Sequence, residues 1–198
     1  IQVRAIKTAD DQEDMDRIEI LVDESSNGVR IDTKHNKKAK GSGWFNWNGD
    51  NSGEVEYIVQ APQDLELRLV DTVNGNVTIE GVSADVKAET VNGDIEISGL
   101  AGDASLDTVN GDIEAHFLSF GDSQNAKFDT VNGAIKVYLP QDVSARVTAD
   151  TVNGSIKNDF GLKVEKGFVS RELDGELGNG GGRLSFDTVN GSIQIRAN

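Results

Sequence analysis

Apolar and polar residues alternate along most of the chain from residue 61 to residue 198. The alternation is clearest around six near copies of the pentapeptide Asp-Thr-Val-Asn-Gly. In each copy the residue before the acid is apolar, and so is the second residue after the Gly. A period of two is typical of half-buried β-strands, and no segment shows a convincing helical period. Each copy therefore predicts a strand, an Asn-Gly turn and a second strand.

The copies recur at a nearly constant spacing. They begin at Asp71, Glu89, Asp107, Asp129, Asp150 and Asp187. Most steps are of 18 to 22 residues, and the last step, of 37 residues, has room for one repeat and an insertion. A period near 20 residues is typical of repeat architectures.

Two all-β folds fit this unit. In a parallel β-solenoid of about six or more rungs, each motif residue stacks on its own copy about 4.8 Å away. Stacked Asn side chains can then form an amide ladder, and Gly supplies a backbone conformation that other residues avoid. The alternative is an antiparallel β-meander, because Asn-Gly is also a strong hairpin signal. The solenoid is favoured because it also explains why Asp, Thr and Val are repeated.

The sequence predicts one solenoid domain over residues 1–198. Residues 1–60 lack the motif but contain strand-like segments, and they are expected to form an irregular cap on the N-terminal edge. Regular repeats occupy residues 61–160 and an insertion occupies 161–183. The last rung, 184–198, leaves an edge that the insertion should cover or extend. Oligomers could form through either end of the solenoid.

The charge of the chain argues against some classes of binding partner. With 34 acidic and 19 basic residues the formal net charge is −15, which argues against nucleic acid and anionic lipid. No apolar run approaches the roughly 20 residues of a membrane span. The chain contains no Cys and two His, His35 and His116, so its sequence offers no nucleophile–base arrangement.

Two groups of residues are candidate sites. The segment 33–53 is a basic island with both Trp residues of the chain, and it predicts a contact loop for an anionic target or a hydrophobic cap. Its candidate residues are Lys37, Lys38, Lys40, Trp44, Phe45 and Trp47. The second group is an outward column of acids whose mutual repulsion Ca²⁺ could relieve, although Lys neighbours and water could do the same. Its metal candidates are Asp71, Glu89, Asp107, Asp129 and Asp150.

The repeats also carry a family resemblance. The segments "TVNGDIEISGL" and "TVNGSIKNDF", the lead-in "APQDLELR" and the closing "LDGELGNGGGRLSFDTVNGSIQI" resemble a bacterial β-strand-repeat family of unknown function. That family is classed with adhesins and is related to head-domain adhesins. The resemblance covers residues 55–198. It implies a β-solenoid that is exported or associated with the cell envelope, and it brings no catalytic residues and no cofactor.

The resulting expectation is a non-enzymatic structural or adhesive protein with a cell-surface, glycan or protein partner. Two alternatives remain. One is a polysaccharide-acting enzyme of the β-helix type, because such enzymes use acidic clusters on their outer face. The other is a calcium-dependent binding module.

Overall fold

The computed structural model describes residues 2–25, 28–35, 54–167 and 170–198. The chain divides into two compact units, Ile1–Ala61 and Pro62–Asn198. The first unit contains two antiparallel strand pairs, β1 with β4 and β2 with β3, and one short helix. Its elements are β1 (Gln2–Thr8), α1 (Gln12–Asp16), β2 (Ile18–Ser25), β3 (Gly28–His35) and β4 (Glu54–Gln60). That this part caps the repeats stays a prediction.

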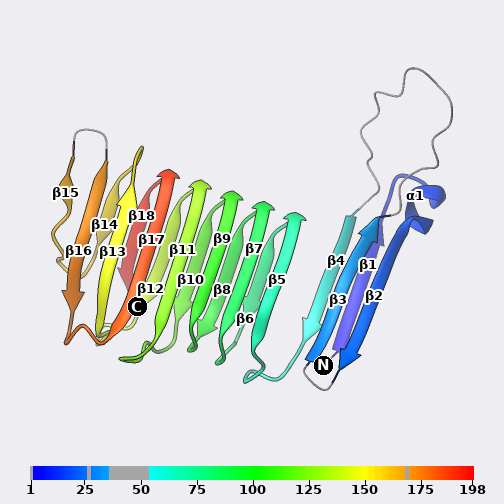
Figure 1. The fold of residues 1–198 in the computed structure, drawn as a ribbon, viewed down its shortest axis with the longest axis horizontal. Helices are drawn as coiled ribbons and strands as arrows, with labels where there is room; N and C mark the ends of the chain where they lie inside the picture. The colour runs from blue at the N-terminus through cyan, green and yellow to red at the C-terminus, as the bar shows by residue number, and fades with distance from the viewer. Residues whose placement is uncertain (1, 26–27, 36–53, 168–169) are drawn as a thin grey trace. The chain divides into compact units, whose positions relative to one another are not determined.

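The second unit consists of two mainly parallel sheets (Figure 1). The eight-stranded sheet has the order β15 (Glu165–Lys166), β16 (Arg171–Leu177), β13 (Ala145–Thr151), β17 (Gly182–Asn190), β11 (Asn125–Asn132), β9 (Ala104–Asn110), β7 (Val86–Asn92) and β5 (Leu67–Asn74). The six-stranded sheet has the order β14 (Ile156–Asn158), β18 (Ile193–Ala197), β12 (Ile135–Leu139), β10 (Ile113–Phe117), β8 (Ile95–Leu100) and β6 (Val77–Glu80).

The repeats pair in register. Each copy gives its first strand to the eight-stranded sheet and its second strand to the six-stranded sheet, and corresponding residues of neighbouring copies are paired in parallel. The two strands that flank an Asn-Gly therefore lie in different sheets, so the repeats do not form the antiparallel meander. The all-β prediction is confirmed, and the parallel pairing is consistent with a solenoid. Neighbouring parallel strands cannot be joined by a tight hairpin, so the chain must cross over between them. Here the strand in the other sheet is part of each crossover.

The core lies between the two sheets and is built by the alternation. The apolar residues on either side of each motif are buried, except Val70, which is partly buried, and the residues that alternate with them along the strands face outward. The largest fully buried side chains in this unit are Phe117, Phe128, Phe186, Ile95, Ile97, Leu100, Leu106, Ile113, Ile135, Leu139 and Leu173. Every buried side-chain nitrogen and oxygen that the structure describes has a hydrogen-bond partner. The buried polar side chains described in this unit are Gln124 and one row of Thr.

That Thr row explains one of the repeated motif residues. Thr108 is 5% exposed, and its hydroxyl donates a hydrogen bond of 3.1 Å to the carbonyl oxygen of Gly93 in the neighbouring rung. The same bond joins Thr90, Thr130, Thr151 and Thr188 to Gly75, Gly111, Gly191 and Gly133. A buried hydroxyl without such a partner would be costly. The Thr is therefore repeated because each rung needs an internal donor at this corner.

The Asn residues form the predicted ladder. The amide nitrogen of Asn110 donates to the side-chain oxygen of Asn92 at 2.9 Å, and Asn132 donates to Asn110 at the same distance. The ladder runs Asn74, Asn92, Asn110, Asn132, Asn190 and Asn153. Its side chains lie at an exposed corner. The prediction of a continuous column is confirmed, with Asn190 inserted between Asn132 and Asn153.

Candidate functional site

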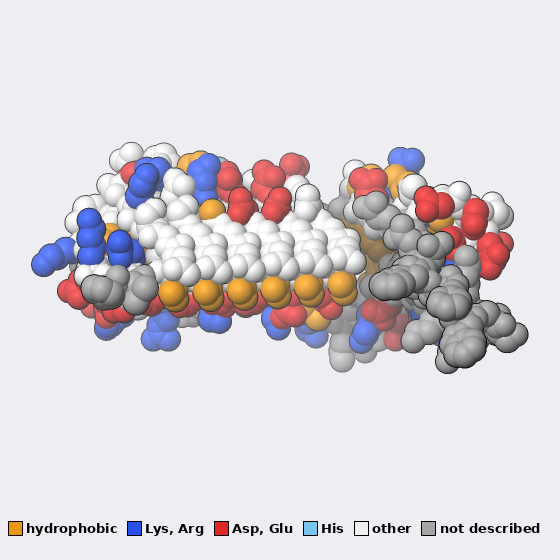
Figure 2. All heavy atoms as spheres, turned by 90° about the horizontal axis from the view of Figure 1, so that it is seen from above, with side chains coloured by type: hydrophobic (Ala, Val, Ile, Leu, Met, Phe, Trp, Pro, Cys, Tyr) orange, Lys and Arg blue, Asp and Glu red, His pale blue; other side chains and the backbone are white. Residues whose placement is uncertain are grey.

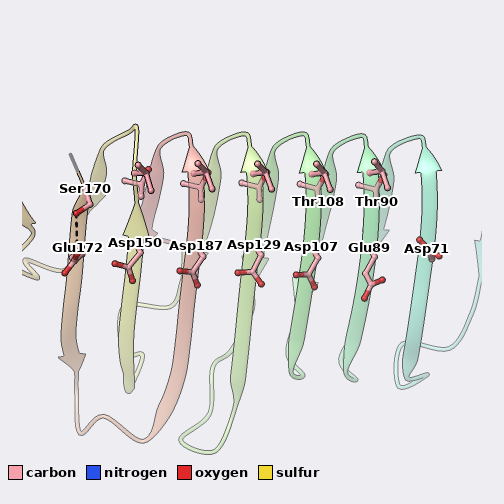
Figure 3. A pocket seen from close by; sticks show the side chains of 18 residues that line it. Asp71, Glu89, Thr90, Asp107, Thr108, Asp129, Asp150, Ser170, Glu172 and Asp187 are labelled. Atoms are coloured by element: carbon pink, nitrogen blue, oxygen red, sulfur yellow. Dashed lines mark hydrogen bonds between the residues drawn. The ribbon is translucent and has the colours of Figure 1, made fainter. Parts of the chain in front are cut away.

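Asp and Val are the two motif residues that the stacking of rungs leaves unexplained. Thr and Asn each bond to the adjacent rung, and Gly lets the adjacent rung approach. The alternation points Asp and Val outward from the eight-stranded sheet, where they form two rows. Apart from Val73, these rows line a groove of about 730 Å³ together with Ser170, which precedes β16, and Glu172 of β16 (Figure 3). Its composition makes this groove the candidate site.

The first row consists of carboxylates in adjacent strands. Strand register places them in the order Asp71, Glu89, Asp107, Asp129, Asp187, Asp150 and Glu172 (Figure 3). This column includes all five acids that the sequence analysis proposed as metal candidates. The outward column was predicted from the sequence, but the position of Asp187 between Asp129 and Asp150 was not.

The second row is apolar and exposed. It consists of Val73, Val91, Val109, Val131, Val189 and Val152, each at least 40% exposed. Figure 2 shows a straight row of apolar side chains along the repeats, with acidic side chains beside it. Contiguous apolar surface of this kind commonly marks a contact site. This row was not predicted from the sequence, although the strict alternation already placed every motif Val on the outer face.

Cations neutralise only part of the carboxylate row. Lys87 forms an ion pair with Glu89 at 2.7 Å, and Lys127 pairs with Asp129. Among the ion pairs of the described residues, none joins a cation to Asp107, Asp150 or Asp187. Ser105 and Ser185 instead donate hydrogen bonds of 3.3 Å to Asp107 and Asp187. The C-terminal half of the row is therefore rich in uncompensated negative charge.

This crowding disturbs the ionisation of three acids. Burial, together with a hydrogen bond and repulsion from Asp129, raises the pKa of Asp107. Burial and repulsion from Asp129 raise the pKa of Asp187. Burial and repulsion from Asp187 and Glu172 raise the pKa of Asp150. Each shift means that the charged form is less stable in the folded protein than in the unfolded chain.

We expect Asp107→Asn to stabilise the protein slightly at pH 7. The folded-state pKa of Asp107 lies above the unfolded value, so the folded protein binds more protons between the two values and gains stability as the pH falls through them. Removing the charge should raise the melting temperature at pH 7 by about 1–2 °C, an effect within the roughly 0.5 kcal/mol typical of partly exposed sites. This gain should shrink as the pH falls through the folded-state pKa of Asp107 towards the unfolded value.

Glu114→Gln is the matched control for this experiment. Burial acts to raise the pKa of Glu114, but hydrogen bonds from His116 and Lys136 outweigh it and lower this pKa. The substitution should therefore destabilise the protein at pH 7. Melting curves of both variants between pH 7 and pH 3.5 give the test. A stabilising Glu114→Gln, or a destabilising Asp107→Asn, would contradict the assignment of strain to the carboxylate row.

The other residues considered in the sequence are the contact loop, the metal candidates and His116. The contact-loop residues Lys37, Lys38, Lys40, Trp44, Phe45 and Trp47 lie outside the described residues. Within the described part of the chain, no group of three or more His, Asp or Glu side chains is arranged to hold a metal ion. A calcium ion between rungs stays a prediction. His116 stacks on Tyr138 with 4.1 Å between ring centroids and bonds to Glu114 at 2.9 Å, so it has partners on the outer face of the other sheet.

Comparison with known proteins identifies the family. The family model Toastrack DUF4097, a domain of unknown function, matches residues 51–196. The chain belongs to this family. The family predicted from the repeats is thereby confirmed.

A solved structure supports the fold. The crystal structure of a putative cell adhesion protein from Clostridium sporogenes matches with a TM-score of 0.53 and 14% sequence identity. The match covers 99% of this chain and 82% of that chain. At this identity the likeness concerns the fold alone. No curated protein matches the chain. Among the described residues, no helix has the length and apolar character needed to cross a membrane.

Proposed function

We propose that this Toastrack domain is a non-enzymatic adhesion module of the cell envelope, which binds its partner along the groove of the eight-stranded sheet. One observation carries the proposal. Asp or Glu and Val are repeated in all six copies on the outer face, where the stacking of the rungs makes no use of them. The raised pKa values of Asp107, Asp150 and Asp187 indicate that the acids are kept at a cost to stability. Residues that break local stability rules are expected at functional sites.

The two rows define the chemistry of the partner. The carboxylates attract positive charge, and the adjacent Val methyl groups favour aliphatic surface. Because both rows run across the strands, they fit an extended ligand rather than a compact one. The proposed partner is an extended protein segment rich in Lys or Arg, whose side-chain stems lie on the Val row while their charges meet the acids.

A surface location agrees with the comparisons. The similar structure from Clostridium sporogenes is that of a protein assigned to cell adhesion. The repeated outer face supports the same role for this chain. Export to the periplasm, cell surface or medium is part of this proposal, and fractionation of producing cells would test it.

Binding to a basic peptide tests the groove. The probe is a peptide of alternating Lys and Val immobilised on a sensor, with the full chain in solution. We expect binding that weakens as salt is raised, because exposed charge pairs are screened. The triple variant Asp107→Asn, Asp129→Asn, Asp187→Asn should bind at least about tenfold more weakly, which corresponds to a loss of roughly 1.4 kcal/mol.

A second triple variant separates a built site from general charge attraction. Glu80→Gln, Glu96→Gln and Glu114→Gln remove the same charge from the outer face of the six-stranded sheet. This variant should bind nearly as well as the unmodified chain. Equal losses in the two triple variants would show that the peptide senses only net charge, and the proposal would fail. A Val109→Asp variant that binds better would contradict the role of the apolar row.

A glycoside hydrolase is the second candidate, and one observation favours it. Asp107, with its raised pKa, lies beside Asp129 in the groove, and glycosidases use one protonated and one ionised carboxyl group. Against this, the described residues that line the groove include no aromatic side chain for sugar stacking. Release of reducing sugar from neutral polysaccharides, abolished by Asp129→Asn, would favour the enzyme over the adhesion module.

The basic aromatic loop remains a further proposed contact. Its residues, between positions 33 and 53, could bind an anionic target while the groove binds a cationic one. A glycan array with the full chain and a Trp44→Ala, Trp47→Ala variant would test it independently of the groove.

A further inference from the structure

The last rung in the sequence is not the last rung in the stack. Strand β17 lies between β11 and β13, and β18 lies between β12 and β14 (Figure 1). Strands β11 and β13 both pair with β17 in parallel and in register. The segment 182–198 therefore occupies a slot between two rungs that precede it in the chain.

The inserted rung connects the strands at one end of both sheets to the earlier repeats. Among the described strands, β13 pairs only with β16 and β17, and β14 pairs only with β18. Strand β15 pairs only with β16. Without segment 182–198, residues 145–177 would have no strand pairing to the earlier repeats.

The slot recognises the motif itself. Asp187 and Thr188 pair with Asp129 and Thr130 on one side, and with Asp150 and Thr151 on the other. Asn190 donates to Asn132 and accepts from Asn153, both at 2.8 Å. These contacts depend on the pentapeptide and not on which molecule supplies it. The same segment of a second copy would make every one of them.

The connection to the inserted rung is a short Gly-rich hinge. Leu177 at the end of β16 and Gly182 at the start of β17 both pair with Ala145, from opposite sides. Residues 178–181 thus cross the width of β13, a span of about 10 Å for two strand spacings. Gly178 and Gly180 adopt positive φ values of 57° and 71°, which L-residues rarely do.

We propose that segment 182–198 is an exchangeable rung and that the slot of one molecule accepts this segment from a second copy. The product is a dimer in which each chain donates its C-terminal rung to the other, with the native contacts kept and only the hinge changed. The tethered segment competes at an effective concentration of about millimolar. The unmodified chain therefore stays monomeric at micromolar concentration and exchanges when it is refolded near millimolar concentration.

Shortening the hinge should drive the exchange. Deleting residues 179–180 leaves three Cα–Cα steps, or about 11 Å, which barely spans β13 and cannot curve around its end. After refolding at about 10 µM, this variant should elute as a dimer in light-scattering chromatography. A variant with two Gly inserted in the same hinge should stay monomeric. A deletion variant that is monomeric with an unchanged melting temperature would overturn the proposal.

Cross-linking distinguishes rung exchange from surface association. Lys127 on β11 and Ser185 on β17 are register partners, and the chain has no Cys of its own. K127C and S185C are prepared as separate chains, mixed unfolded, refolded together and oxidised. Rung exchange gives a disulfide-linked pair of one chain of each kind. Should the deletion variant fail to fold, the same mixture with the natural hinge at about 1 mM decides. Absence of the mixed disulfide there would reject the proposal.

Discussion

Replacing Gly111 with Ala should be among the most damaging single substitutions in the repeats. A Cβ atom at this position would lie 1.9 Å from the carbonyl oxygen and 2.5 Å from the carbonyl carbon of Gly93. Both atoms belong to the backbone of the adjacent rung, so no rotamer change can relieve the clash. The rungs would have to separate at the corner, which weakens the Thr108 hydrogen bond and the Asn ladder. We expect a loss of at least about 3 kcal/mol, at the upper end of overpacking effects.

The first copy of the motif supplies the control. Gly75 occupies the same motif position, but the nearest heavy atom to its added Cβ is the Thr72 hydroxyl oxygen, at 3.5 Å. Gly75→Ala should therefore cost less than about 1 kcal/mol. Urea denaturation of both variants measures the difference. Neither Gly75 nor Gly111 has a positive φ, so similar losses at the two positions would contradict the close approach of the next rung as the reason for the Gly.

Much of the fold followed from the repeat. In each rung the Thr bonds to the motif Gly of the next rung, the Asn bonds to the next Asn, and the Gly packs on the next Gly. A repeated pentapeptide therefore already predicts parallel pairing in register. The alternation also predicted which side of each strand is buried, as Leu106 and Ile113 show. The insertion 161–183 was expected to cover or extend the edge left by the last rung. It does extend the sheet through β16, which pairs antiparallel with β13, but the predicted edge was wrong because the last rung lies between β13 and β11.

The order of the rungs could not be predicted from the same information. Every copy presents the same Thr, Asn and Gly, and an Asp or Glu, to its neighbours, so the motif specifies register but not which copies are adjacent. Only the long step between Asp150 and Asp187 marked this region as irregular. The alternating segment from Arg171 to Leu177 lets the last rung lie between two earlier rungs, because it covers the outer edge of β13 while the chain returns to the slot.

Only part of the candidate site could be predicted from the sequence. The acidic column followed from the alternation once stacking was assumed. The Val row also followed, but an apolar residue next to a turn is more easily assigned to the core than to the surface. The pKa shifts of Asp107, Asp150 and Asp187 depend on the local desolvation and on distances between rungs, which a sequence does not give.

Phe186→Ala tests the inserted rung from its core side. Phe186 is fully buried, and its ring stacks on that of Phe128 with 5.1 Å between centroids. Its other in-register neighbour is Ala149, which is too small to fill the space that the ring would leave. A large cavity at such a site costs about 3–5 kcal/mol. Urea denaturation should show this loss in the free energy of unfolding.

Hydrogen exchange shows whether the loss of stability in Phe186→Ala spreads to the strands that the order of the rungs predicts. Because β13, β14 and β16 pair with the earlier repeats only through β17 and β18, loosening the inserted rung should lower protection in all of these strands. Strands β5 and β7, at the opposite end of the eight-stranded sheet, should keep most of their protection. Leu106→Ala in β9 is the control, since it removes a fully buried side chain three strands away from β13 and should leave β16 protected relative to β7. If Phe186→Ala lowers protection in β7 as much as in β16, the inserted rung is not what attaches residues 145–177 to the earlier repeats.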